Sequence, residues 1–251
     1  MKTTTENKSG NWAWRVLKWL AIIVPILLVV IYLGVGAVVA TNLSTPKRDF
    51  SPDKLVSMQS LTYQDVRFPS RGSDAQIAGW FMPNSNSNRA VILVHGKDVS
   101  RAAEFAGKFI DLGTALERGG FNVLMIDLRG HGQSSDAQFS FGLNERRDVE
   151  GAVDWLKGQG FKSGSIGVLG VSLGAASSIG ATADDTDIGA LVEDSGFASF
   201  CPILQAQWGN ASGLPDIFLP SSLFMNRVMY GYDLCASRPV DEIGRIARVR
   251  C

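Results

Sequence analysis

A run of 21 residues without a charged side chain, 20–40, most constrains what this chain can fold into. As an α-helix the run would be about 31 Å long, which matches a hydrocarbon core of ~30 Å. Trp12, Trp14 and Trp19 lie at its upstream end, where an interfacial aromatic belt is expected. Pro25 would weaken a soluble helix but is tolerated in a membrane span. We therefore predict a transmembrane helix or signal anchor over residues 20–40.

A cleaved signal peptide is the alternative interpretation, because small residues precede Thr41 as they do at a cleavage site. The apolar region of a signal peptide is normally ~7–15 residues, so the longer run favours an uncleaved anchor. Four basic residues precede the run and three follow it closely, which weakly favours a cytoplasmic segment over 1–19. We then expect a linker over 41–60 and an extracytoplasmic main domain over 61–251.

The composition of the chain excludes several classes of function. Its 24 basic and 24 acidic residues cancel, so no excess positive charge is available for a nucleic-acid partner. Three cysteines are too few for a disulfide scaffold, and no Cys/His cluster has zinc-site spacing. We therefore expect no metal and no cofactor. Cys201 and Cys235 bracket an apolar, aromatic segment, 200–234, and either a disulfide or two free thiols is consistent with them.

Short apolar runs alternate with helical periods over most of the remaining chain. Unbroken runs indicate strands covered on both faces, as in a parallel sheet, and they occur at 91–94, 123–126, 166–171 and 190–192. Two helices are predicted between them from apolar residues on one face: Phe105, Phe109, Leu112 and Leu116, with Ser100 as N-cap, and then Val149, Ala152, Val153 and Leu156. A strand pair over 62–68 and 75–82 comes first, so the order predicts an α/β sheet that begins with antiparallel strands.

The sharpest motif is the G-x-S-x-G sequence over 170–174. Nucleophilic chemistry of this kind needs a serine on a sharp strand-to-helix turn, with its hydroxyl exposed. The motif alone arises easily by chance, but here it follows a strand-like run and precedes a small-residue helical segment, 175–181. We predict that Ser172 is the catalytic nucleophile, between a strand that ends near Val171 and a helix that begins near Leu173.

Two further segments stand in the matching order. His95-Gly96-Lys97 follows the run at 91–94, and 127–134, Asp-Leu-Arg-Gly-His-Gly-Gln-Ser, follows the run at 123–126. Together with Ser172 these residues resemble the α/β-hydrolase superfamily, specifically its esterase, lipase and serine-peptidase branch. The resemblance covers about 61–250 and implies a mostly parallel sheet with helices on both faces. It also implies that the backbone N–H groups of Lys97 and Leu173 form the oxyanion hole.

The sequence departs from that family at the catalytic triad. The family order is Ser, then Asp or Glu, then His, and no histidine follows Ser172. His95 and His131, the only two histidines, lie in turns and are interpreted as structural residues that orient loops. Asp194 is an alternative acid, although a solvated or N-capping role is favoured. The family's acid and base would follow a strand starting near Arg250, so we expect a domain without its last strands.

We therefore expect a membrane-anchored serine hydrolase that acts on a carboxylic ester. A serine peptidase or amidase, and a non-catalytic or truncated protein without a complete triad, are the alternatives. The substrate would be a small-molecule ester or peptide. The apolar segment 200–234 would either line an acyl pocket or pack on the sheet edge. Because serine without a base is a poor nucleophile, we expect the 251-residue chain to hydrolyse short p-nitrophenyl esters at or near background.

Overall fold

A mixed sheet of six strands forms the centre of the computed structural model, which describes residues 9–48 and 62–246. Its strands are β1 (Gln64–Pro69), β2 (Gln76–Met82), β3 (Ala90–Val94), β4 (Asn122–Ile126), β5 (Ile166–Val171) and β6 (Ile188–Asp194). They are arranged in the order β1-β2-β4-β3-β5-β6. β1 and β2 pair antiparallel, β2 also pairs antiparallel with β4, and β4, β3, β5 and β6 are parallel. The predicted α/β sheet with antiparallel strands first is confirmed.

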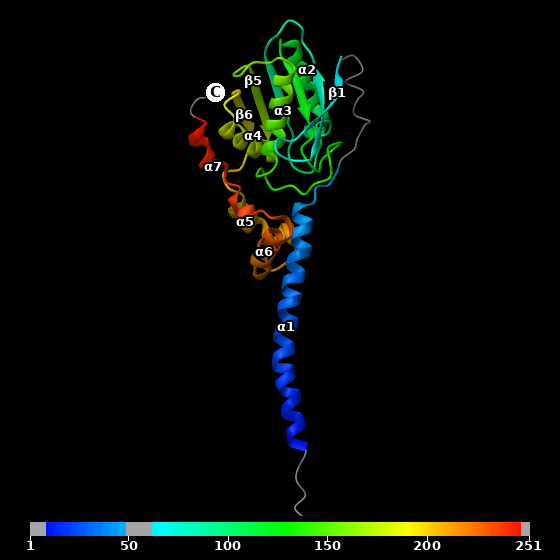
Figure 1. Cartoon of the computed structure of the whole chain (residues 1–251), viewed down its shortest axis with the longest axis vertical. Helices are drawn as coiled ribbons and strands as arrows, with labels where there is room; N and C mark the ends of the chain where they lie inside the picture. Colours follow the sequence, from blue (N-terminus) through cyan, green and yellow to red (C-terminus); the bar gives the residue numbers. More distant parts are fainter. Residues whose placement is uncertain (1–8, 49–61, 247–251) are drawn as a thin grey trace, which may run out of the picture.

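Helices cover both faces of this sheet (Figure 1). The three are α2 (Lys108–Arg118), α3 (Arg146–Gly158) and α4 (Leu173–Asp184). Neighbouring residues of β3 show why its apolar run is unbroken, since side chains along a strand alternate between faces. Ile92 packs in the core cluster that holds Val153 of α3, while Leu93 packs in the one that holds Phe109 of α2. Each face of the sheet therefore has its own apolar layer.

The helix predicted to begin after Ser100 begins only at Lys108. A 3-10 turn, η2 (Glu104–Gly107), precedes it, and Phe105 within this turn has a φ of 50°. Gly107 follows with a φ of 94°, so the helical backbone cannot continue upstream. Phe105 is consequently exposed, and the buried face of α2 starts at Phe109, which corrects the expectation for Phe105.

Helix α1 (Ser9–Ser44) is longer than the predicted span and projects from the rest of the molecule (Figure 1). It is long and apolar enough to cross a membrane. Residues 41–44, predicted as linker, are helical instead, and the hydroxyl of Thr41 donates to the Ala37 carbonyl at 3.0 Å. The rest of that predicted linker, from 49 on, lies outside the described residues. The last turns of α1 are also covered, because Val35 and Val39 pack against the domain core.

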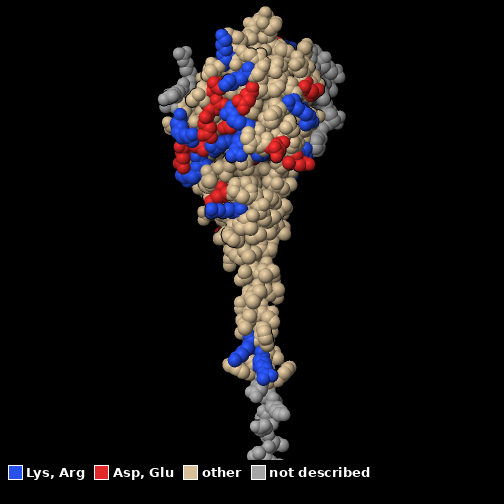
Figure 2. All heavy atoms as spheres, viewed as in Figure 1, with Lys and Arg blue, Asp and Glu red and all other residues tan. Residues whose placement is uncertain are grey.

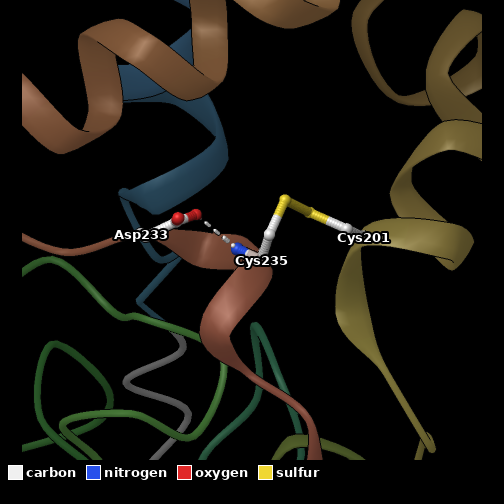
Figure 3. Close-up of a disulfide and its surroundings, with 3 residues drawn as sticks. All are labelled: Cys201, Asp233 and Cys235. Atoms are coloured by element: carbon white, nitrogen blue, oxygen red, sulfur yellow. Dashed lines mark hydrogen bonds between the residues drawn. A yellow bond between two sulfur atoms is a disulfide. The ribbon is translucent and has the colours of Figure 1, made fainter.

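A helical hairpin formed by α5 (Phe200–Ser212), the turn η3 (Asp216–Phe218) and α6 (Leu219–Tyr230) follows β6. Its second helix lies beside α1 (Figure 1), while Phe200 and Leu204 of α5 pack in the domain core cluster. Cys201 and Cys235 form a disulfide at the base of the hairpin (Figure 3), which decides between the two thiol states left open above. Three short helices end the described chain: η4 (Leu234–Ala236), α7 (Pro239–Glu242) and η5 (Ile243–Arg245).

Candidate active site

Ser172 occupies the turn between β5 and α4, as predicted: the strand ends at Val171 and the helix begins at Leu173. Its backbone has φ 52° and ψ −108°, a conformation that side-chain-bearing residues rarely adopt. Such a conformation costs of order 1–3 kcal/mol and persists only where the surrounding structure enforces it. Here the Ser172 N–H donates to the Asp194 carbonyl at 2.8 Å, which ties the turn to the end of β6.

The two glycines of the motif are required by close backbone approaches. A Cβ at Gly170 would lie 2.4 Å from the Gly174 carbonyl oxygen. A Cβ at Gly174 would lie 2.4 Å from the Val94 carbonyl oxygen, because the first turn of α4 rests against the end of β3. Any side chain at either position would push the strand and helix apart, so the G-x-S-x-G spacing follows from the packing of this turn.

The His95-Gly96-Lys97 loop lies next to Ser172. A Cβ at Gly96 would be 3.4 Å from the Ser172 Cβ, so the small residue lets the loop approach the serine. The Gly96 N–H donates to the carboxylate of Glu104 at 2.6 Å, and Glu104 itself is buried. Glu104 was not identified from the sequence, because the contact depends on the positive-φ turn η2, which leaves no pattern in the residue types.

The N–H groups of Lys97 and Leu173 have the hydrogen-bonding freedom that an oxyanion hole requires. Within 9–48 and 62–246, neither donates a hydrogen bond to a protein acceptor. Leu173 is the first residue of α4, so its N–H is one of the unsatisfied donors at a helix N-terminus, where the dipole favours negative charge. The role of both amides as donors to an oxyanion stays a prediction.

Both ring nitrogens of each histidine are already engaged. His95 is fully buried, with Nδ1 2.6 Å from the Gly96 carbonyl and Nε2 accepting from the Leu128 N–H at 3.0 Å. In His131, Nδ1 is 2.9 Å from the Arg129 carbonyl and Nε2 accepts from the Asp98 N–H at 3.2 Å. Each ring is therefore neutral, with its proton on Nδ1.

Burial keeps these rings neutral. The pKa of each imidazole is lowered to about 4, mainly by the loss of hydration on burial and, for His131, also by the neighbouring His95. A base for Ser172 needs a free ring nitrogen near the hydroxyl, and neither histidine offers one. The interpretation of His95 and His131 as structural residues that orient loops is confirmed.

The carboxylate of Asp194 is exposed and accepts a hydrogen bond from the Ser195 hydroxyl at 2.7 Å. It contacts neither histidine within the described residues, so the favoured interpretation, a solvated carboxylate, agrees with the structure. Asp194 serves Ser172 through its backbone carbonyl alone.

Asp127 organises the second loop of the site from a buried position. Its carboxylate pairs with the Arg101 guanidinium and accepts the N–H groups of Arg101 and Gln133 at 2.9 and 2.8 Å. A Cβ at Gly132 would fall 2.1 Å from this carboxylate, so the glycine lets the loop wrap around it. Sequence reasoning placed Asp127 in this motif but did not identify Arg101 as its partner.

A cavity of about 360 Å³ adjoins the Lys97 loop. The other walls come from the last turns of α1, including Val39 and Leu43, and from the end of α5 at Ala211 and Ser212. Among the described residues, no cluster of three His, Cys, Asp or Glu side chains is arranged to hold a metal ion. The space beside the candidate oxyanion loop is therefore bounded by α1 and the hairpin.

Comparison with known proteins places this site in a wider group. The sequence profile of the X-Pro dipeptidyl-peptidase (S15) family matches residues 43–207, which is more than half of the chain. The chain is 29% identical over 179 residues to the uncharacterized protein YqkD of Bacillus subtilis, covering 68% of this chain and 56% of that protein. It is 27% identical over 162 residues to the uncharacterized protein YfhR of Escherichia coli, covering 61% and 54%. The chain thus spans about half the length of these curated relatives.

Solved structures show the same fold. An esterase of Pyrococcus furiosus is similar with a TM-score of 0.57 and 28% identity, over 76% of this chain and 71% of that chain. The α/β hydrolase GrgF of a Penicillium species is similar with a TM-score of 0.51 and 21% identity, over 61% and 53%. The first likeness extends to sequence, while the second concerns the fold alone.

Proposed function

Because the chain belongs to the X-Pro dipeptidyl-peptidase (S15) family and has the α/β-hydrolase fold, we propose that it is a membrane-anchored serine hydrolase that acts on a carboxylic ester. The strained turn at Ser172 carries this proposal, because it places the serine at the N-terminus of α4 and next to the His95-Gly96-Lys97 loop. The likeness to an esterase favours an ester, and the family's description keeps an amide or peptide substrate as the second candidate.

In the proposed reaction, the Ser172 oxygen attacks the carbonyl carbon and its proton passes to a base. The oxyanion of the tetrahedral intermediate accepts hydrogen bonds from the Lys97 and Leu173 N–H groups. Collapse of the intermediate expels the alcohol and leaves an acyl-serine, which water then hydrolyses. Since the ring nitrogens of His95 and His131 are engaged, the proton passes to water or to added imidazole, which returns a proton to the leaving alcohol, and without imidazole both acylation and hydrolysis are slow.

The anchoring part of the proposal rests on α1, most of whose apolar side chains are left exposed by the described residues, 9–48 and 62–246. The Cys201–Cys235 disulfide supports an extracytoplasmic domain, because disulfides persist in oxidising compartments. The sum of these features favours a hydrolase domain held at the outer surface of a membrane.

The test exploits the lack of a free imidazole. The purified full chain is treated with p-nitrophenyl acetate, with and without added imidazole, and acylated peptides are identified by mass spectrometry. We expect steady turnover near background, an acetyl group that accumulates on Ser172, and faster acylation with imidazole. Ser172→Ala should abolish the adduct, whereas Ser195→Ala, the exposed neighbouring serine, should retain it.

An absence of any adduct that depends on Ser172 would refute the nucleophile assignment. Faster acylation of Ser172 by an Xaa-Pro anilide than by the ester would favour the peptidase candidate instead. Rapid turnover without imidazole, abolished by Ser172→Ala, would show that a base is already present and would contradict the expected slow reaction.

A further inference from the structure

We propose that the tip of the α5–α6 hairpin is a second lipid-contacting element, immersed beside α1 in the membrane leaflet nearest the domain. This inference rests on the proposed function in one respect, namely that α1 spans the bilayer. It concerns a different part of the chain, since the hairpin was expected to line an acyl pocket or the sheet edge.

The tip of the hairpin lies beside the middle of α1. The Tyr32 hydroxyl donates to the Ile217 carbonyl at 2.8 Å, and the Tyr32 ring lies 5.7 Å from the Phe218 ring. Four residues further along α1, a Cβ at Gly36 would lie 2.7 Å from the Ser221 backbone, so the two helices touch closely there. The tip, η3, is therefore level with Tyr32, and α6 rises from it toward the domain.

A bilayer can occupy only a limited range of positions along α1. No charged residue occurs between Lys18 and the end of the helix, so the hydrocarbon core must lie within 19–44. A core of ~30 Å needs about 20 helical residues. The windows that fit run from 19–38 to 25–44, and Tyr32 lies inside every one. Even the window nearest the N-terminus places Tyr32 about 9 Å below the domain-side boundary.

The surface of the hairpin is mostly apolar. Segment 200–234 carries only three charged residues, and apolar side chains project from α6 and the tip into solvent. Ile217 is 67% exposed, Phe224 55% and Val228 61%. Figure 2 shows one face, on which most of the surface between the basic side chains low on α1 and the charged body of the domain is uncharged. Exposed apolar surface continuous with a membrane helix fits lipid better than water.

Two exposed charges on the hairpin limit the depth of insertion, Asp216 at the tip and Arg227 on α6, which lies nearer the domain. Asp216 is exposed at the tip, and inserting a carboxylate is most costly at the bilayer centre and less costly near the interface. The window nearest the N-terminus, 19–38, keeps Asp216 closest to the headgroups and so is the favoured one. The hairpin then reaches the outer part of the hydrocarbon core without approaching its centre.

The test measures depth at single sites in the full chain. An environment-sensitive NBD fluorophore is attached to an Ile217→Cys variant on a Cys251→Ser background, and the protein is reconstituted in phosphatidylcholine vesicles containing brominated phosphatidylcholine. The Cys201–Cys235 disulfide stays intact. We expect a blue-shifted emission and loss of most of the fluorescence through bromine quenching. Phe224→Cys, higher on α6, provides a second site and should be quenched more by bromine near the headgroups.

Two controls separate the possible failures. Asn86→Cys lies on an exposed loop at the amino-terminal edge of the sheet and should not be quenched. Ile26→Cys reports on α1 itself and should be quenched strongly. Quenching at position 26 but at neither 217 nor 224 overturns the hairpin proposal and leaves the anchor intact. An absence of quenching at 26, 217 and 224 overturns both, because α1 then does not lie in the bilayer.

Discussion

The contribution of the Cys201–Cys235 disulfide to the free energy of unfolding follows from the length of the loop that it closes. The two cysteines are separated by 34 residues along the chain. Closing a loop of that length lowers the entropy of the unfolded chain, and the loop-closure relation gives about 4 kcal/mol of stabilisation at 25 °C. Replacing both cysteines by serine should lower the free energy of unfolding by that amount.

The effect should fall on global unfolding and not on local opening of the hairpin. In the folded domain the ends of the loop are held independently, since the Phe200 N–H donates to the Ser237 carbonyl at 3.0 Å and Leu234 is buried. When only the hairpin opens, its ends therefore stay close, with or without the sulfur bridge. The disulfide gains its stabilisation only where the whole domain unfolds.

The assay is urea unfolding in a mild detergent, followed by tryptophan fluorescence, with Cys251→Ser in all samples. A slope of ~2 kcal/mol/M converts the loss into a midpoint lower by about 2 M. Limited proteolysis of the hairpin under native conditions should be equally slow in the disulfide and double-serine proteins. An unchanged midpoint would refute the entropic reasoning, and faster hairpin cleavage in the double-serine protein would refute the argument that the ends of the loop stay close when only the hairpin opens.

Three further predictions follow from close contacts and buried groups. Gly174→Ala should lower the free energy of unfolding by about 1–3 kcal/mol, because its Cβ would meet a backbone oxygen of β3, while Gly209→Ala, which has open space, should not lower it; thermal melts measure both. The free energy of unfolding should be constant from pH 8 to 7 and fall from about pH 6.5 to 4, because His95 and His131 are protonated first in the unfolded chain. Urea unfolding in matched buffers should show a loss of roughly 3 kcal/mol for each histidine by pH 4. A flat profile would contradict the burial argument. Glu104→Gln should slow imidazole-assisted acylation of Ser172 several-fold at unchanged thermal stability, because the substitution weakens the hydrogen bond from the Gly96 N–H that holds the adjacent loop. An unchanged rate would mean that this hydrogen bond does not position the site.

The serine turn could be predicted because its constraints are local in sequence. Gly170 and Gly174 are required by contacts within one strand–turn–helix unit and its nearest strand, so the residue types themselves record the geometry. The structural role of the histidines was predictable for a similar reason. Chain order alone places His95 and His131 before Ser172, at turns that follow strands.

The partner of the apolar segment could not be predicted in the same way. Hydrophobic burial is non-directional, so the apolar residues of 200–234 indicate that something covers them without specifying what. The structure places α6 against α1 through Tyr32 and Gly36, more than 180 residues away in sequence. The sequence pattern of α1 likewise indicates a span, yet it predicts a linker over 41–44, where the helix continues for one more turn. The contact with α6 that stabilises this turn is non-local.

The candidate oxyanion loop is held by hydrogen bonds to residues both near to it and far from it in sequence. Three groups fix its backbone: Glu104 accepts from the Gly96 N–H at 2.6 Å, His131 accepts from the Asp98 N–H at 3.2 Å, and the Asp98 carboxylate accepts from the Lys47 N–H at 2.9 Å. Lys47 lies three residues beyond the end of α1, so the segment that leaves this helix contacts the loop beside Ser172. An amide that binds an oxyanion must be held rigidly before the charge develops. Neither histidine can therefore act as a base for Ser172, because both are neutral, buried hydrogen-bond partners of the backbone in and around this loop.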